Sequence, residues 1–434
     1  MIKLCKVSLA LVALTIGLTQ KSVADAVVDW NVIAVQAVNA ATSTGLRPGP
    51  SSVLDFAIVN AAIYDAVEAI DGRFKPYHVR IRRASGSPVA ATAKAAHDVL
   101  VNRFPAQAAA LDTAYHTYLA NNGLAENDPG VLVGQEAAAG IIALRADDGS
   151  FPANPEAFSG GTDPGEWRPT PGTMTPMLVP WLATVTPYTL RDPTQFRAPP
   201  PLDLDSSQYT AEYNEVKAMG ALVNSARTPE QTDFAYFFAD NAILYWNRAI
   251  QSIANTYLNN IGDSARLFAL VTLAQADSAI TAWDNKRHYH FWRPVTAIQN
   301  GDNDLNPYTA GDPNWLPLII TPSYPEYTSG ANNLSGSATR MLKHFFGTDE
   351  VTFSLTSNFA QAVQKTRTYS RLSDAANDVM NARIYEGIHF RTADELGRMQ
   401  GEHVADWAFN HFLRPLGDND HDGDDDGDHG HGHH

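Results

Sequence analysis

Apolar residues recur at intervals of three and four positions along most of the chain, which is the spacing of one buried helix face. The clearest stretch is residues 56–70, Phe-Ala-Ile-Val-Asn-Ala-Ala-Ile-Tyr-Asp-Ala-Val-Glu-Ala-Ile. The same spacing predicts further helices over residues 90–103, 107–121, 131–145, 210–225, 229–260, 264–290, 331–346, 373–388 and 392–413. Few segments alternate apolar and polar residues as a strand does. The pattern therefore predicts an all-α helical bundle with short connections.

Residues 147–207 interrupt this pattern because they are rich in Pro, Gly and Thr. Such a stretch predicts one long irregular loop over the bundle, and loops of this kind often border a pocket.

The first residues of the chain are typical of a secretory signal. Lys3 and Lys6 precede a short apolar run over residues 7–18, and Ser22-Val23-Ala24 is a small-residue cleavage site. A first core helix is the alternative, but the run is too short to span a membrane and its flanks fit export. We therefore expect a signal peptide over residues 1–24 and a secreted or periplasmic protein.

The last residues, 417–434, consist mainly of Asp, His and Gly. Two Asp-x-Asp-x-Asp-Gly runs resemble half of a calcium loop, but the twelfth position of each register is His429 or His433 rather than Glu. A disordered tail with weak cation affinity is the favoured interpretation. One helical domain is then expected over residues 25–416.

Composition and charge exclude several classes of function. Hydrophobic residues make up 44% of the chain and charged residues 18%, which is ordinary for a globular protein. A nucleic-acid partner is not expected, because 31 basic against 47 acidic residues would repel a polyanion. After the first 20 residues no apolar run is long enough to predict a membrane span. The single cysteine, Cys5, lies in the predicted signal, which excludes thiol chemistry in the exported protein.

The first candidate for chemistry is the run Lys286-Arg-His-Tyr-His-Phe-Trp-Arg293-Pro294. On a helix, residues seven apart lie about 20° from each other, so Lys286 and Arg293 would share one face. Pro294 predicts that the helix ends at Arg293. Two converging cations indicate an oxyanion site. Considered in isolation, however, the run is better explained as a solvated basic face with snorkelling side chains.

Two further segments add to this candidate. Ser329 and Gly330 precede an apolar helix, and free N–H groups at a helix start favour an anion; an ordinary N-cap serine is the alternative. His389 lies in a tight link between two predicted helices, the second starting at Thr392 with a capping box to Glu395. Arg383 and Gly387 are four residues apart, so the glycine is expected to leave room beside the guanidinium.

Taken together, the order Lys-x6-Arg-Pro, Ser-Gly at a helix start, and Arg-x3-Gly-x-His resembles the vanadium-dependent haloperoxidases. These enzymes share their anion pocket with the type 2 phosphatidic acid phosphatases and the bacterial acid phosphatases. The resemblance is strongest over residues 277–407, and the run from Tyr385 to Asp394 is similar to the bacterial haloperoxidase-related branch. It implies the helical bundle of that superfamily, a vanadate cofactor, and hydrogen peroxide and halide as substrates, or a phosphate ester in a phosphatase. A homo-oligomer is compatible with it.

The resemblance also implies a role for each residue of the pocket. His389 would bind vanadium, or attack phosphorus in a phosphatase, and Lys286 would polarise the bound peroxide. Three cations would neutralise the equatorial oxygens of the anion, and two groups at the helix start would donate hydrogen bonds. The implied binding set is Lys286, Arg293, Ser329, Gly330, Arg383 and His389.

One position departs from the family. Its second motif usually reads Pro-Ser-Gly-His, whereas this chain reads Thr-Ser-Gly-Ala331. Alanine cannot transfer a proton, and a general acid or base typically supplies ~10²–10⁴-fold in rate. Candidate substitutes are His288, His290, Glu326 and Asn332, of which the two histidines are more typical of packing. The leading expectation is an exported haloperoxidase-like enzyme with an altered acid/base group. A phosphatase and a non-catalytic oxyanion-binding protein are the alternatives.

Overall fold

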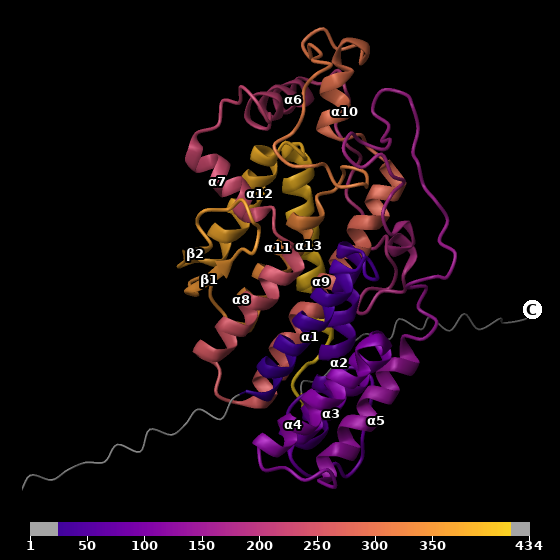
Figure 1. Ribbon diagram of the computed structural model, residues 1–434, viewed down its shortest axis with the longest axis vertical. Helices are drawn as coiled ribbons and strands as arrows, with labels where there is room; N and C mark the ends of the chain where they lie inside the picture. The colour runs from indigo at the N-terminus through magenta and orange to yellow at the C-terminus, as the bar shows by residue number, and fades with distance from the viewer. Residues whose placement is uncertain (1–24, 418–434) are drawn as a thin grey trace, which may run out of the picture.

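The computed structural model describes residues 25–417 (Figure 1). The predicted signal peptide, and the predicted tail beyond Gly417, lie outside the described residues. The helices are α1 (Ala26–Ser43), α2 (Ser52–Asp71), α3 (Pro88–Arg103), α4 (Ala108–Asn121), α5 (Pro129–Leu144), α6 (Ser207–Met219), α7 (Pro229–Phe238), α8 (Ala242–Tyr257), α9 (Ile261–Tyr289), α10 (Pro294–Gln299), α11 (Gly330–Phe346), α12 (Leu372–Glu386) and α13 (Arg391–His411). Strands β1 (Phe353–Thr356) and β2 (Thr366–Tyr369) form an antiparallel hairpin. The predicted all-α class is confirmed.

Two predicted helices have different bounds. The helix predicted over residues 229–260 is two helices, α7 and α8, because Asn241 starts a new helix by accepting the N–H of Ile243 at 3.0 Å. The helix predicted over residues 210–225 ends at Met219, because the backbone that follows pairs with residues 316–318: Leu222 donates to the Leu316 carbonyl at 2.8 Å, and Gly220 accepts the N–H of Leu318 at 2.9 Å. Helices α1 and α10 and the β hairpin were not predicted.

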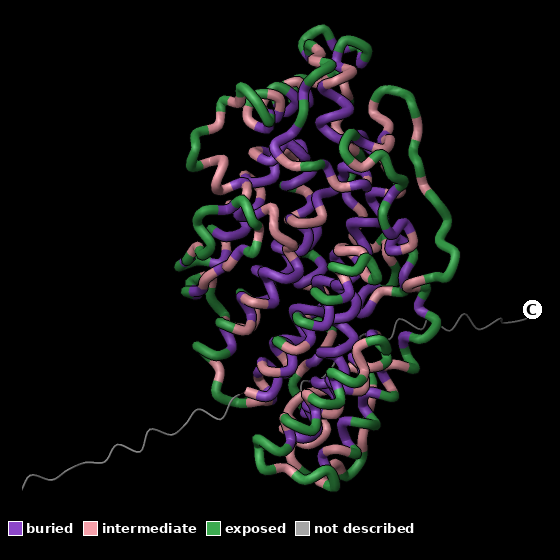
Figure 2. Tube along the Cα trace, viewed as in Figure 1, coloured by how far each residue is buried: buried purple, intermediate pink, exposed green. Residues whose placement is uncertain are grey.

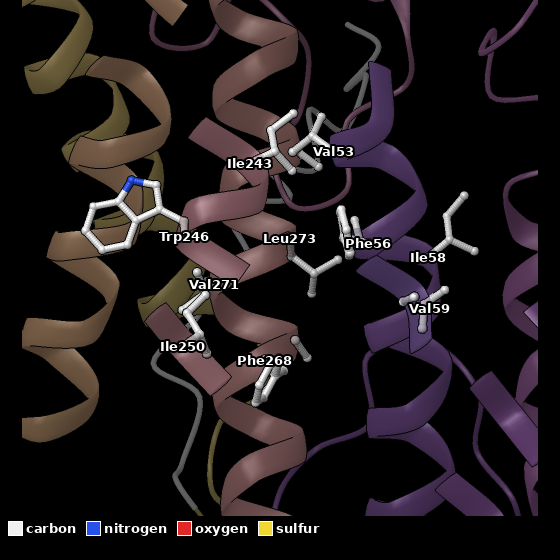
Figure 3. Packing of buried hydrophobic residues seen from close by; sticks show 14 of the residues in the cluster. Val53, Phe56, Ile58, Val59, Ile243, Trp246, Ile250, Phe268, Val271 and Leu273 are labelled. Carbon is white, nitrogen blue, oxygen red and sulfur yellow. The ribbon is translucent and has the colours of Figure 1, made fainter. Parts of the chain in front are cut away.

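Helix α9 is the centre of the core. It packs against α2, α11 and α13, and apolar residues cover it on all sides, as expected of a helix inside a bundle. Figure 3 shows Phe268 and Leu273 of α9 beside Phe56 of α2 and Ile250 of α8. The buried stretches follow the middle of the molecule along its length in Figure 2. Among the described residues, no helix is long and apolar enough to cross a membrane.

The segment over residues 147–207 is irregular, as predicted, apart from a short 3₁₀ turn at Pro180–Thr184. Two acidic residues of α9 bind this segment. The carboxylate of Asp277 accepts the backbone N–H groups of Tyr188 and Thr189 at 2.6 and 2.7 Å, and Arg197 pairs with Asp284 at 2.6 Å. The segment therefore contacts the C-terminal half of α9, which carries Lys286.

Candidate active site

The sequence-predicted residues come from five places in the fold. Lys286 lies in the last turn of α9, Arg293 precedes α10, and Ser329 precedes α11. Arg383 lies in the last turn of α12, and His389 lies in the link between α12 and α13. All five residues are buried.

Lys286 and Arg293 do not share a helical face, so that prediction is wrong. Helix α9 ends at Tyr289, and His290 turns the chain with a left-handed backbone (φ 35°, ψ 42°). The backbone of the next residues pairs with the irregular segment, where Trp167 donates to the His290 carbonyl at 2.6 Å. Pro294 starts a new helix and leaves Arg293 extended. The burial of both cations also excludes a solvated basic face.

The ammonium of Lys286 binds the chain just before α11. Its Nζ lies 2.9 Å from the carbonyl oxygens of Pro325 and Glu326 and 2.6 Å from that of Thr328. A lysine has three N–H donors, so all three have partners in this arrangement. Burial lowers the pKa of Lys286 well below its ordinary value, and the nearby charge of Arg293 adds to this. Against this effect, the three carbonyl oxygens need three N–H donors, which only the charged ammonium has. Lys286 thus contributes its charge to the site, while its N–H groups hold the loop.

Arg293 and His389 are in direct contact. The Nη1 of Arg293 donates to the Ile388 carbonyl at 2.7 Å and lies 3.1 Å from the Nε2 of His389. Arginine can only donate, so Nε2 must accept and the ring proton lies on Nδ1. Burial lowers the pKa of His389 well below its ordinary value, as do the charges of Arg293, Lys286 and Arg383. The imidazole is therefore neutral, with its lone pair on the side of the arginine.

Glu326 holds the other side of this imidazole. Its Oε1 accepts the Nδ1 proton of His389 and the backbone N–H of Phe390, both at 2.9 Å. Burial raises the pKa of Glu326 to about 7. The sequence had suggested Glu326 only as a substitute acid or base. Its place against His389 could not be found from spacing, because the two residues lie on separate loops, 63 positions apart.

Arg383 is anchored from one side only. Its Nη2 donates to the Phe238 carbonyl and to the carboxylate of Glu386, which is buried. Its Nε and the Nη2 of Arg293 are buried and have no partner among the described residues. Gly387 does not make room for this guanidinium, contrary to the prediction. It ends α12 in the left-handed region (φ 79°), where a Cβ would lie 2.5 Å from the Gly220 carbonyl oxygen.

Ser329 occupies the N-cap position of α11, but its side chain does not cap the helix. Its hydroxyl oxygen instead accepts the side-chain N–H of Asn332 at 3.1 Å, and Asn332 also donates to the buried Asp394 at 2.7 Å. Burial raises the pKa of Asp394 well above its ordinary value. An ordinary N-cap serine is therefore not what the structure contains. Gly330 lies beside Trp283, where a Cβ would be 3.4 Å from the indole ring.

The remaining candidates lie elsewhere. His288 is exposed, and His290 faces Glu166 of the irregular segment at 3.6 Å. The predicted capping box of Thr392 is wrong, because α13 begins at Arg391 and the N–H and hydroxyl of Thr392 both bind the carboxylate of Glu212. These long-range partners outcompete a local cap.

A cavity of about 230 Å³ opens beside the start of α11. Gly330, Ala331 and Arg383 contribute to its lining, together with Trp283 and Tyr324. No residue of the irregular segment lines it, although the Leu178 carbonyl accepts the Trp283 indole N–H at 3.2 Å. The described residues contain no group of three or more His, Cys, Asp or Glu side chains that could hold a metal ion.

Part of the chain is similar to known proteins in sequence. Residues 266–418 match the model of the VCPO second helical-bundle domain. A vanadium chloroperoxidase from Curvularia inaequalis is 30% identical over 184 residues, a match that covers 35% of this chain and 30% of that protein.

Two solved structures share the fold over most of the chain. The first bacterial vanadium-dependent iodoperoxidase superposes with a TM-score of 0.77 at 22% identity, covering 90% of this chain and 98% of that one. A holo-type bacterial vanadium-dependent chloroperoxidase gives 0.70 at 19% identity, covering 84% and 91%.

Proposed function

We propose that the chain is an exported haloperoxidase-like enzyme. The match of residues 266–418 to the VCPO second helical-bundle domain confirms the family resemblance and supports the haloperoxidase part of this proposal. The enzyme would oxidise halide with hydrogen peroxide at a vanadate bound by His389. The observation that carries this proposal is the neutral imidazole of His389 in contact with Arg293 and close to the charges of Lys286 and Arg383. A buried cluster of cations around one neutral ring nitrogen is suited to an oxyanion.

The donor set fits vanadate on the structure's own terms. The buried Arg293 Nη2 and Arg383 Nε lack partners among the described residues, and such atoms are costly to bury unless a ligand accepts from them. When bound, vanadate supplies the centre at which peroxide becomes reactive toward halide. In this proposal Arg293 donates to the bound anion instead of to His389. The Nε2 lone pair of His389 is then free to bind the same anion.

Each protein group has a separate task in the proposed mechanism. Arg293 and Arg383 orient the anion through N–H donors, and Lys286 stabilises it by charge, since its N–H groups hold backbone carbonyls. Glu326 keeps the His389 proton on Nδ1. The site is buried, so water does not screen these charges.

Ala331 favours a second function for the same pocket, binding of an oxyanion without turnover. Alanine offers no proton at the position where the family motif carries histidine. A phosphatase, with His389 Nε2 attacking phosphorus, would meet the same difficulty, because its leaving group also needs a proton. Anion binding depends on other residues and is expected in all three cases.

The test is a vanadate titration of the wild type and of Ala331→His, followed by peroxide and chloride, bromide or iodide. Halide oxidation that needs vanadate supports the enzyme, and we expect Ala331→His to raise its rate by about 10²-fold. Vanadate binding with no turnover in the wild type, and a gain in the variant, identifies the non-catalytic binder. Hydrolysis of a phosphate ester, inhibited by vanadate, identifies the phosphatase. A protein that binds no vanadate contradicts the proposed pocket.

Export is a proposal of its own. Cleavage after Ala24 would leave Asp25 as the first residue, and the Asp25 carboxylate caps α1 by accepting the N–H of Val27 at 2.9 Å. Amino-terminal sequencing of the protein from its native host should therefore begin at Asp25. A mature protein that begins at Met1 would contradict export by this signal.

A further inference from the structure

The link between α2 and α3, residues 72–87, is strongly basic although the chain as a whole is acidic. The whole chain has 47 acidic against 31 basic residues, whereas this link contains no Asp or Glu. We call residues 72–87 the basic link. Its basic residues are Arg73, Lys75, Arg80, Arg82 and Arg83. A concentration of one charge on a short segment attracts a partner of the opposite charge.

The backbone of the basic link is held by the rest of the protein. The buried carboxylate of Asp65 in α2 accepts the backbone N–H groups of Tyr77 and Val79 at 2.6 and 2.7 Å. The side chains of Val79 and Ile81 also pack against the hydrophobic core. The arginines that alternate with and follow these residues are therefore carried by a fixed backbone, and a partner would not have to order it.

Three arginines of the basic link have no partner in the part of the chain that the structure describes. Arg80, Arg82 and Arg83 are exposed, and no described carboxylate pairs with them. Arg73, in contrast, pairs with two carboxylates of the protein body, at 2.5 and 2.8 Å. Three guanidinium groups within four residues repel one another, and an anionic partner would offset that repulsion.

The acidic C-terminal tail, residues 418–434, begins beside the basic link. It contains seven Asp and no Lys or Arg. The residues just before it are bound to the start of the link, because Leu416 donates to the Arg73 carbonyl at 2.9 Å and the Arg414 carbonyl accepts the backbone N–H of Lys75 at 2.7 Å. The tail is therefore tethered next to a segment of opposite charge.

The tail is long enough to reach the free arginines. Arg83 follows Arg73 by ten residues, a span of at most about 36 Å, and the 17 residues of the tail extend to about 60 Å. A tether of this kind gives an effective concentration near the millimolar range, so several individually weak surface ion pairs are enough. Acidic residues outnumber basic ones outside the tail as well, so most of the remaining surface repels it.

We propose that the acidic tail binds the basic link of its own chain, with Asp side chains of the tail against Arg80, Arg82 and Arg83. The bound tail neutralises the basic link and closes it to polyanions from solution. This contact depends on neither vanadate nor halide, so it stands or falls independently of the proposed function.

The experiment measures the distance between two spin labels by pulsed electron paramagnetic resonance on the full chain. Ser85→Cys places one label on an exposed position of the basic link, Gly427→Cys places the other among the aspartates of the tail, and Cys5→Ser removes the natural thiol. We expect a short, narrow distance distribution at about 0.01 M salt and a broad one at about 1 M, because the Debye length falls from about 30 Å to about 3 Å.

Charge variants of the labelled chain test the residues. Replacing the three arginines together, Arg80→Gln, Arg82→Gln and Arg83→Gln, should abolish the short distance even at low salt. Replacing all seven Asp of the tail by Asn should do the same. The triple Lys variant, Arg80→Lys, Arg82→Lys and Arg83→Lys, is the matched control and should keep the short distance, since it keeps the charge. The three arginines are exposed, so their variants are expected to fold.

The same distribution in the labelled parent and in the triple Gln variant would overturn the proposal, as would loss of the short distance in the triple Lys variant. Dilution with excess unlabelled protein tests whether the contact lies within one chain. The short distance should persist, and its loss would show that the tail binds a second copy instead. Heparin, a soluble polyanion, should bind the Asp→Asn variant more tightly than the parent, and equal binding to both would contradict a closed basic link.

Discussion

Replacing Glu326 by alanine tests whether the imidazole of His389 is set for anion binding by its carboxylate neighbour. The change removes the acceptor of the Nδ1 proton and of the Phe390 N–H, both at 2.9 Å. Each of these buried donors would be left without a partner, at about 1–3 kcal/mol apiece. The ring would then lose the acceptor that holds its proton on Nδ1, and only the contact with Arg293 would still oppose a shift of the proton to Nε2, the atom that must stay unprotonated to bind the anion.

We expect Glu326→Ala to weaken vanadate binding by about 10–100-fold, the usual effect of losing the partner that orients a histidine ligand. Glu326→Gln should lose less, because its amide oxygen can still accept from Nδ1. Vanadate affinity is measured by equilibrium dialysis, and the position of the His389 proton by ¹⁵N NMR of the ring without vanadate. The NMR readout tests the tautomer directly, since a loss of stability alone would not move the proton.

Glu68→Gln is the matched control. Glu68 is a buried carboxylate of α2 that accepts the N–H of Phe74, and it does not line the cavity. This variant should lose stability and keep its vanadate affinity. The reasoning is refuted if folded Glu326→Ala binds vanadate as tightly as the wild type and keeps its ring proton on Nδ1.

Three further predictions concern stability, each measured by urea unfolding. Burial raises the pKa of Asp65 to about 6, so its folded state holds a proton more tightly than its unfolded state; the free energy of unfolding should fall as pH rises from about 4 to 6, by up to about 3 kcal/mol, and this fall should be absent in Asp65→Asn. Gly401→Ala should destabilise by about 1–3 kcal/mol, because a Cβ there would lie 2.1 Å from the Asn333 carbonyl oxygen and force α13 away from α11. Leu273→Ala should lower the free energy of unfolding by about 2–5 kcal/mol, because it leaves a cavity in the core. This loss should be the same at pH 4 and at pH 6. A pH slope unchanged in Asp65→Asn, or unfolding midpoints of Gly401→Ala or Leu273→Ala equal to the wild type, would contradict the corresponding argument.

The helical fold could be predicted where one face or all faces of a helix are apolar. Leu267, Leu270 and Ile280 of α9 are all buried, as their spacing indicates. The end of a helix within an apolar run could not be predicted where it depends on a distant partner. The end of α6 at Met219 is an example, since the backbone that follows it pairs with residues 316–318, which are far along the chain.

The candidate site shows the same division between local and long-range information. The sequence could predict that Ser329 lies at a helix start and His389 in a link between helices, because caps and turn residues are local signals. It could not predict the direction in which each side chain points. Lys286 and Arg293 meet their partners through a chain reversal at His290, whose left-handed backbone no helical-wheel argument contains.

The long-range partners also change what the motif residues can do. A lysine at the position of Lys286 would be expected to donate to a ligand, yet its donors hold the loop that carries Glu326 and Ser329. That loop in turn delivers the carboxylate that fixes the proton of His389. The lysine therefore acts on the imidazole through the backbone as well as by charge. Replacing it should disturb the ring as much as the anion, so loss of anion binding in a Lys286 variant would not by itself identify a direct ligand.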